Sequence, residues 1–294
     1  MAVAATGFFD GVHLGHRLVL SRLADAARAR GTQSVVVTFW PHPRTVLQHD
    51  ARTLRLLTSL DEKRRLLSAA GVDRVEVVPF TKEFSRLDTE TYLREWVIGR
   101  FGADAIVLGY DNRIGSQAGT PAEIARVAER LGLTVIRTGQ VDSGDGPAIS
   151  STRIRGLLEA GDVEGAAGML GYRYGLHGVV VAGNQLGRKI GFPTANMQLY
   201  EPLKLVPAGG VYLVEVETLE RRLYGMCNIG YRPTVSPDRR LTIETHIFDF
   251  DEDIYGLDIR ISFVRKIRDE RRFDSLSALA RQLESDRNLC FSLI

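Results

Sequence analysis

Short apolar runs alternate with longer amphipathic stretches through the first half of the chain. The clearest run, residues 34–39 (Ser-Val-Val-Val-Thr-Phe), is continuous and β-branched, as expected of a strand buried on both faces of a parallel sheet. Strands that alternate with helices of about 10–15 residues predict such a sheet with helices on both faces. The expected strands are 2–6, 34–39, 75–78, 103–108 and 134–137, and the expected helices are 17–30, 59–70, 89–100 and 120–131.

Capping and breaking residues mark the helix boundaries. Ser59 and Glu62 have the spacing of a capping box, and Thr120 precedes Pro121, which suits the first position of a helix. By contrast, the two prolines of residues 40–44 (Trp-Pro-His-Pro-Arg) predict a segment without regular structure. The later helical stretches are 154–160 and 162–170, the expected hinge is 171–175, and the predicted domains are 1–171 and 172–294.

The pattern changes after the hinge. Strand candidates are now separated by turns rather than by long helices, which favours an antiparallel barrel or sandwich. Leu276, Leu279 and Leu283 recur at helical spacing within 275–286, which predicts a closing amphipathic helix. The strand candidates are 177–181, 210–217, 223–229, 241–248 and 257–264.

Composition places the chain among ordinary globular proteins, with 44% hydrophobic and 25% charged residues. Its 294 residues suffice for two domains with separate cores, and the net charge of +2 gives no support for a nucleic-acid partner. Cys227 and Cys290 lie far apart, without metal-ligand spacing. No run reaches the roughly 20 apolar residues of a membrane span, and no signal-peptide pattern is present. We therefore expect a cytoplasmic protein without membrane or nucleic-acid partners.

Residues 7–16 (Gly-Phe-Phe-Asp-Gly-Val-His-Leu-Gly-His) join the first expected strand to the first expected helix. A helix N-terminus offers free backbone N–H groups and the positive end of a dipole, which suit a phosphate group. Gly15 lets the backbone approach a ligand closely. His13 and His16 can donate hydrogen bonds to charge that develops on a phosphate during its transfer. The alternative is a plain turn with two solvated histidines.

Two later segments can reach the same edge of the predicted sheet. Residues 109–115 (Gly-Tyr-Asp-Asn-Arg-Ile-Gly) follow a strand directly, as a ligand-binding loop would. Residues 149–155 (Ile-Ser-Ser-Thr-Arg-Ile-Arg) gather hydroxyls and guanidiniums that can hold phosphate oxygens at a helix start. Taken alone, the second segment is more simply a Ser/Thr cap with two solvated arginines.

A glycine-rich loop in the second half is a further candidate for phosphate binding. It contains Arg188 and Lys189, yet a lone loop of this kind is more often a plain β connection. Thr194 and Asn196, in Pro-Thr-Ala-Asn, follow it. Their oxygen atoms are hard ligands, suited to a Mg²⁺ ion held mainly by substrate phosphates.

Glu244 and His246 alternate with apolar neighbours in residues 243–248, so they share one face of a strand. A carboxylate there can accept the proton of a substrate hydroxyl as it attacks a γ-phosphate. Any half-exposed strand shows the same alternation, so this pattern alone decides nothing.

As a set, the first-half segments are more specific than any one of them. The stretches 7–16, 40–44 and 149–155 resemble, in order and spacing, the nucleotidyltransferase module of bacterial bifunctional riboflavin kinase/FAD synthetases. The chain departs from the family's usual pattern at Asn112 and Ile114, where aromatic residues are common.

The second half resembles the riboflavin kinase module of the same family, so the resemblance covers essentially the whole chain. The matching segments are Gly-x-x-x-Gly-Arg-x-x-Gly-Phe-Pro-Thr-Ala-Asn (183–196), Asn-Ile-Gly-Tyr-Arg-Pro-Thr (228–234), Glu-Thr-His (244–246) and the stretch from Arg268 to Leu276.

The resemblance implies an α/β plus β fold: a Rossmann-like nucleotidyltransferase sheet, then a small antiparallel β-barrel with a closing helix. It implies that the C-terminal domain phosphorylates riboflavin to FMN with ATP. The N-terminal domain would adenylylate FMN to FAD and release pyrophosphate. Mg²⁺ is the implied cofactor, and ATP, riboflavin and FMN are the implied small-molecule partners. We expect a monomer or weak homo-oligomer.

The resemblance also implies roles for single residues. Glu244 would be the kinase base, with Thr194 and Asn196 on Mg²⁺, Gly183, Arg188 and Lys189 on ATP, and Asn228 and Arg268 on the flavin. In the N-terminal domain, His13, His16 and Arg153 would stabilise the transferring and leaving phosphates, while Ser151 and Thr152 position them. Further ATP or FMN contacts would come from Gly7, Phe8, Asp10, Gly15, Asp111 and Arg113.

Two other functions fit parts of the chain. A nucleotidyltransferase for another phosphorylated acceptor, such as a phosphopantetheine or glycerol phosphate, explains the first half but leaves the Pro-Thr-Ala-Asn loop and Glu244 unused. A flavin-binding sensor or carrier without catalysis is the third reading, and the presence of Thr194, Asn196 and Glu244 counts against it.

Overall fold

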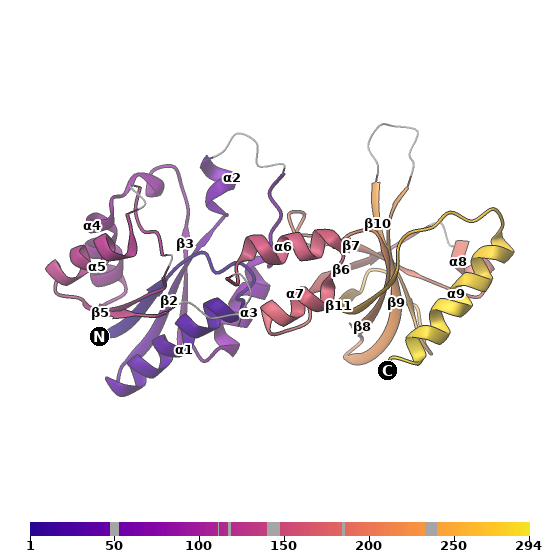
Figure 1. Cartoon of the computed structure of the whole chain (residues 1–294), viewed down its shortest axis with the longest axis horizontal. Helices are drawn as coiled ribbons and strands as arrows, with labels where there is room; N and C mark the ends of the chain where they lie inside the picture. The colour runs from indigo at the N-terminus through magenta and orange to yellow at the C-terminus, as the bar shows by residue number, and fades with distance from the viewer. Residues whose placement is uncertain (48–52, 111, 117–118, 140–147, 184–185, 233–239) are drawn as a thin grey trace. The chain divides into compact units, whose positions relative to one another are not determined.

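The computed structural model describes residues 1–47, 53–110, 112–116, 119–139, 148–183, 186–232 and 240–294. Its contacts divide the chain into two units, Met1–Ser151 and Thr152–Ile294 (Figure 1). Each unit is built around a sheet of its own. Residues 152–170 are grouped with the second unit, and the predicted domain boundary at residue 171 stays a prediction.

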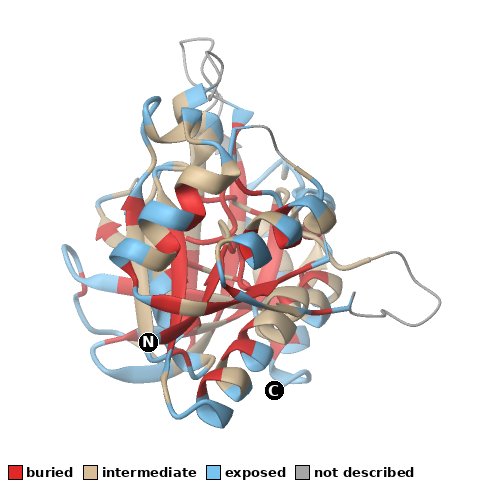
Figure 2. Ribbon diagram, turned by 90° about the vertical axis from the view of Figure 1, so that its left-hand side faces the viewer, coloured by how far each residue is buried: buried red, intermediate tan, exposed pale blue. Residues whose placement is uncertain are grey.

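A parallel sheet of five strands, all in the described residues, forms the centre of the first unit. The strand order is β3-β2-β1-β4-β5. β1 is buried along its whole length, which explains why its sequence is apolar without alternation. Figure 2 shows the central strands of this sheet largely buried between helices with exposed outer turns. The strands are β1 (Ala2–Thr6), β2 (Gln33–Trp40), β3 (Arg74–Pro79), β4 (Ala103–Leu108) and β5 (Thr134–Arg137).

Helices pack on both faces of this sheet, which confirms the predicted α/β class. On one face, Leu20 of α1 and Leu67 of α3 pack against alternate residues of β1 and β4. On the other face, Leu93 of η3 and Ile124 of α5 pack against the intervening residues. The helices are α1 (Leu14–Ala29), α2 (Pro43–Leu47), α3 (Leu60–Ala69), η2 (Phe84–Arg86), α4 (Thr89–Thr91), η3 (Tyr92–Arg100) and α5 (Pro121–Arg130).

The helices differ from the prediction in three places. The two prolines do not prevent regular structure: Pro43 is the first residue of α2, where its missing N–H would have had no partner in any case. Residues 92–100 form a π-helix, in which Phe101 N–H donates to the carbonyl of Trp96. The helix predicted from residue 17 begins at Leu14, because His13 accepts a hydrogen bond at its start.

The second unit contains a closed antiparallel barrel, which decides between the barrel and the sandwich. Within the described residues its strand order is β10-β7-β6-β11-β8-β9, and β9 pairs with β10 to close the circle. The elements are α6 (Ser151–Ala160), α7 (Val163–Leu170), β6 (Gly175–Val181), α8 (Leu186–Lys189), β7 (Ala195–Leu199), β8 (Gly210–Thr218), β9 (Arg221–Arg232), β10 (Arg240–Ile247), β11 (Asp258–Arg268) and the closing helix α9 (Leu276–Phe291).

The barrel strand β7 is absent from the prediction. Its sequence, Ala-Asn-Met-Gln-Leu, has no β-branched residue, so nothing local marks it as a strand. It forms because β6 and β10 each offer it an antiparallel partner. The helix α6 begins at Ser151, three residues before the predicted start.

The predicted capping box is present at the start of α3, and its contribution to stability can be measured. Ser59 Oγ accepts from Glu62 N–H, and Glu62 accepts from Ser59 N–H in return. We expect Ser59→Ala to lower the free energy of unfolding by about 1 kcal/mol, measured by urea denaturation. The control is Ser68→Ala, at an exposed position near the end of the same helix, which should change stability by less than about half as much. Equal effects of the two changes would contradict the cap.

Candidate active sites

The turn between β1 and α1 lies at the point where the strand order of the first sheet reverses. The chain moves outward from β1 through β2 to β3, and then returns to β4 on the other side of β1. Ligands in open α/β sheets bind at the carboxyl ends of the strands at such a point. The loop of residues 7–13 begins at that end of β1.

His13 and His16 form a stacked pair at the start of α1. Their ring centroids are 3.6 Å apart and the planes differ by 16°. His13 Nδ1 accepts a hydrogen bond of 3.3 Å from the backbone N–H of His16. In a neutral imidazole this leaves the proton on Nε2, so His13 can present an N–H donor on its other side.

His16 is held in the neutral form. Burial lowers its pKa well below the usual value, and the nearby charges of His13 and Lys63 lower it further. Its Nδ1 atom is buried and has no hydrogen-bond partner among the described residues. A neutral imidazole can still donate one hydrogen bond to a phosphate oxygen, without a proton being taken up first.

The loop backbone is strained and is anchored by apolar side chains. Phe9 and Val12 adopt left-handed conformations, with φ of 52° and 38°. Such angles are unfavourable for a β-branched residue such as Val12. Both side chains are buried, 5% and 0% exposed, in the same core cluster as α1. A Cβ at Gly15 would lie in tight contact with the His13 ring, at 3.2 Å. The close approach of a ligand to Gly15 stays a prediction.

Asp10 anchors this loop through hydrogen bonds to Leu57 and Thr58. Its carboxylate accepts hydrogen bonds of 3.1 Å from the backbone N–H groups of Leu57 and Thr58 and from Thr58 Oγ1. The side chain of Asp10 is buried. Its bonds therefore fix the loop to the segment before α3, and a contact of Asp10 with a nucleotide stays a prediction.

The loop after β4 meets the end of β1 through Asn112, one of the two departures from the family pattern. Asn112 Nδ2 donates to the carbonyl of Thr6 at 2.8 Å, and its Oδ1 accepts from Gly109 N–H. Ile114, the other departure, is buried in the core next to η3. Arg113 is exposed. Asp111 lies outside the described residues.

The predicted hydroxyl and arginine segment begins at the same loop. Ser151 Oγ donates to the carbonyl of Asp10 at 2.9 Å. Thr152 and Arg153 follow in α6 and are grouped with the second unit. Their contacts with a nucleotide stay predictions.

Strand register assembles the second site. In the barrel, Glu244 of β10 lies directly opposite Asn196 of β7 on one side and Asn228 of β9 on the other. Thr194 Oγ1, just before β7, donates a long hydrogen bond of 3.4 Å to Glu244 Oε2. Four predicted site residues, from three separate stretches of the sequence, are thus brought together.

Two contacts hold the loop that carries Thr194. His246 Nδ1–H donates to the carbonyl of Pro193 at 2.8 Å. Gly183 gives the Asn196 amide its place, because a Cβ at Gly183 would lie 2.3 Å from Asn196 Nδ2. Gly183 therefore leaves room for Asn196, and its predicted contact with ATP phosphates stays a prediction.

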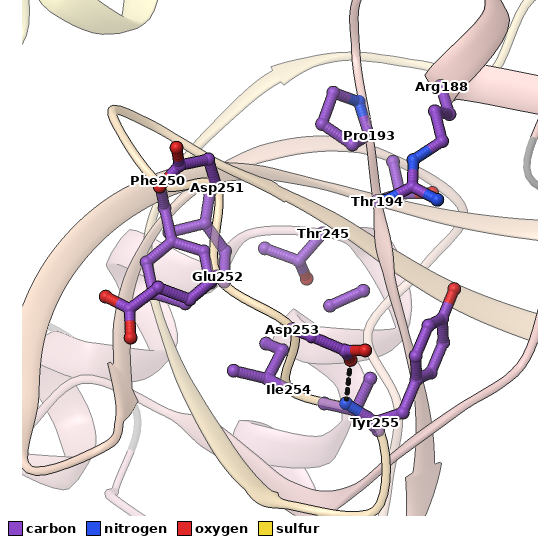
Figure 3. A pocket seen from close by; sticks show the side chains of 13 residues that line it. Arg188, Pro193, Thr194, Thr245, Phe250, Asp251, Glu252, Asp253, Ile254 and Tyr255 are labelled. Carbon is purple, nitrogen blue, oxygen red and sulfur yellow. Dashed lines mark hydrogen bonds between the residues drawn. The ribbon is translucent and has the colours of Figure 1, made fainter.

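A cavity of about 330 Å³ lies beside this loop (Figure 3). Thr194 and the exposed Arg188 border it on one side, and Phe250, Asp251 and Glu252 lie across it. Since Thr194 also contacts Glu244, it links the cavity to the carboxylate. The full lining is Val180, Arg188, Pro193, Thr194, Ala195, Thr245, Ile247 and residues 250–255.

The segment 250–255 lines this cavity, and none of the motifs indicates it. Its acidic run, Asp251-Glu252-Asp253 shortly after a strand, is a signal that could have indicated it.

Lys189 is exposed on α8 and does not line the cavity.

The guanidinium of Arg268 is hydrogen-bonded to other groups of the protein. Its Nε and Nη2 atoms donate to the buried carboxylate of Asp286 in α9, at 2.9 and 2.8 Å. Nη1 donates to the carbonyl of Asp269. The pair attaches the closing helix to β11, and a direct contact of Arg268 with flavin stays a prediction.

The oxygen atoms of Thr194, Asn196 and Glu244 suit a hard divalent cation such as Mg²⁺. Among the described residues there is no group of three His, Cys, Asp or Glu side chains that would form an all-protein metal site. A Mg²⁺ ion held here would complete its coordination with water or with oxygen atoms of a substrate.

Comparisons with known proteins assign a different family model to each of the two parts of the chain. The family model described as FAD synthetase matches residues 1–153, and the one described as riboflavin kinase matches residues 170–293. Two relatives named bifunctional riboflavin kinase/FMN adenylyltransferase, from Listeria monocytogenes and Escherichia coli K12, are each 37% identical over 286 residues, covering 97% of this chain and 90% of the relative. The chain belongs to this family. It combines a riboflavin kinase in its C-terminal part with an FMN adenylyltransferase in its N-terminal part, as the motifs predict.

A solved structure whose name refers to a different activity has the same fold. The structure titled macrolide-efflux protein from Streptococcus pneumoniae matches with a TM-score of 0.91 and 32% identity, over 98% of this chain and 93% of that one. In the described part of the present chain, no helix is both long enough and apolar enough to cross a membrane.

The burial of His246 predicts a pH dependence of stability in the kinase part. Burial is the main cause that lowers the pKa of His246 below its usual value of about 6.5. Below pH 6.5, His246 is protonated in the unfolded chain but remains neutral in the folded protein until a lower pH is reached. The free energy of unfolding therefore falls as the pH falls. We expect the temperature of half-inactivation of riboflavin kinase to drop between pH 7.5 and 5.5.

His246→Gln should make this drop smaller, because the variant has no group to titrate. His177→Gln, which removes a partly exposed histidine on β6, is the control and should not make it smaller. Kinase activity, measured at pH 7.5 after heating at each pH, is the readout. An unchanged pH effect in His246→Gln would show that another group causes it.

Proposed function

We propose that Glu244 is the base of the kinase reaction. It accepts the proton of the ribityl hydroxyl of riboflavin as the hydroxyl oxygen attacks the γ-phosphorus of ATP and ADP leaves. The contact of Thr194 Oγ1 with Glu244 Oε2 is the observation that carries this proposal, because Thr194 also borders the cavity. A nucleotide in the cavity would bring its phosphates next to Glu244.

Thr194 and Asn196 would hold Mg²⁺ together with the ATP phosphates. When bound, the ion neutralises phosphate charge and orients the γ-phosphoryl group. Asn196 is suited to this role because its place is set by strand pairing to Glu244 and by Gly183. His246 supports the same loop through Pro193. Arg188, at the edge of the cavity, would bind phosphate oxygens. Lys189 and Gly183 do not line the cavity, and their contacts with ATP are proposed from the motif alone.

In the adenylyltransferase part, a phosphate oxygen of FMN would attack the α-phosphorus of ATP, and pyrophosphate would leave. The FMN phosphate is already ionised at neutral pH, so the site needs alignment and charge stabilisation rather than a base. His13 and His16 would donate hydrogen bonds to the transferring phosphate. Their stacking at the start of α1 and the lowered pKa of His16 support this role.

Ser151, Thr152 and Arg153 would complete the adenylyl-transfer site at the start of α6. Ser151 is attached to the histidine loop through the carbonyl of Asp10. Arg153 would neutralise the leaving pyrophosphate. We also propose that the protein acts in the cytoplasm on small molecules alone, as a monomer or weak homo-oligomer. The modest net charge is relevant only to the nucleic-acid part of this proposal, for which it offers no attraction.

Glu244→Gln should reduce FMN formation from riboflavin, ATP and Mg²⁺ by at least about 100-fold, because the base is lost. FAD synthesis from supplied FMN should be unchanged. Products are separated by chromatography, and the wild type should form FMN and then FAD. Glu217→Gln, at an exposed position of β8, is the matched control and should keep both activities. Loss of both activities in a folded Glu244→Gln protein would refute the assignment.

His16→Ala should have the opposite effect. Removing a hydrogen-bond donor to the developing phosphate charge should lower FAD formation by about 100-fold, while FMN formation continues. His177→Ala, in the barrel, is the control and should leave FAD formation unchanged. Wild-type FAD formation in His16→Ala would exclude this histidine from the reaction.

A further inference from the structure

A lysine side chain is completely buried in the first unit. Lys63 of α3 has an exposed fraction of 0%, and its Nζ atom has no hydrogen-bond partner among the described residues. Lysine is among the residues least often buried without a partner, because the ammonium group loses its hydration. Such a costly arrangement needs an explanation.

Aromatic rings take the place of hydrogen-bond acceptors around this ammonium group. Nζ lies 3.4 Å from the centre of the Phe8 ring and 5.8 Å from that of Trp40. A cation over an aromatic face is attracted by the negative charge of that face, more strongly when both are removed from water. The charged Asp10 carboxylate, in the same loop as Phe8, acts in the same direction.

We propose that Lys63 is a positioning residue for adenylyl transfer, whose buried positive charge holds Phe8, and with it the loop of residues 7–13, in the arrangement that the reaction needs. This inference rests on the proposed function of the first unit. Phe8 lies in the strained loop that carries His13, so its position is coupled to that of the histidine pair.

The charge, rather than the volume, of the side chain carries this role. A methionine would fill a similar space without the cost of burying a charge, and uncharged replacements of buried ions are often as stable or more stable. A neutral side chain would lose the attraction to the Phe8 ring. The same charge also helps to keep His16 in its neutral form.

The charge is present at neutral pH and is lost at moderately alkaline pH. Burial lowers the pKa of Lys63 to about 8, against the opposing effect of Asp10. The charged group that acts on Lys63 is the Asp10 carboxylate from the loop. His16 of α1 is also close enough to feel the charge of Lys63, but its own lowered pKa keeps it neutral. Phe8 and Trp40, whose rings lie under the ammonium group, do not titrate. FAD synthesis should therefore fall as the pH rises through about 8.

The test compares Lys63→Met and Lys63→Arg with the wild type, in the full-length protein. Arg64→Met removes a positive charge from an exposed position of the same helix and is the matched control. For each protein, FAD synthesis from FMN and ATP is measured between pH 6.5 and 9.5, alongside FMN formation from riboflavin. Thermal unfolding is measured at pH 7.

We expect Lys63→Met to lower kcat for FAD synthesis by at least about tenfold at pH 7, the size of a desolvated cation–π contact. FMN formation should be unchanged, and the protein should unfold at the same or a higher temperature than the wild type. Arg64→Met should behave as the wild type. Lys63→Arg, whose guanidinium stays charged, should lack the loss of activity centred near pH 8, whatever its absolute rate.

Three results would overturn the proposal. One is wild-type FAD synthesis in Lys63→Met. Another is the same alkaline loss in Lys63→Arg as in the wild type, which remains informative if Lys63→Met does not fold. The third is a parallel fall of thermal stability and of both activities in Lys63→Met, which would indicate packing alone. Failure of the proposed function is distinguishable, because the wild type itself would then make no FAD at any pH.

Discussion

Strand register is the constraint on which both sites depend. Side chains alternate between the two faces of a strand, so a slip of one residue in β10 would turn Glu244 away from Thr194 and Asn196. In the first unit, parallel pairing of β1 with β4 brings two loops to one edge, where Asn112 bonds the end of β1. The chemistry of each unit is thus set by pairing between residues far apart in the chain.

The histidine loop shows how a fold compensates for local strain. The left-handed conformations of Phe9 and Val12 cost about 1–3 kcal/mol each. Burial of each side chain returns a similar amount, at about 1.5–3 kcal/mol. Asp10 adds hydrogen bonds to the segment before α3. The loop that leads to His13 is therefore held in place by contacts within the protein itself.

The two units use buried charge in different ways. In the second unit, the guanidinium of Arg268 is hydrogen-bonded to the Asp286 carboxylate, and the pair attaches a helix to the barrel. In the first unit, Lys63 has aromatic rings in place of acceptors, which leaves its protonation sensitive to pH. A satisfied pair stabilises an interface, whereas an ammonium group on a ring near a reaction site can affect the reaction.

The sequence by itself determined the alternation of strands and helices, the capped helix starts at Ser59 and Thr120, and the family, because these depend on short-range signals and motif spacing. It did not reveal the strand β7, the cavity segment 250–255 or the burial of Lys63. The placement of Asn196 and Asn228 on either side of Glu244 was equally hidden. These features arise only when strands distant in sequence pair and close around one another, and that pairing is a property of the tertiary structure.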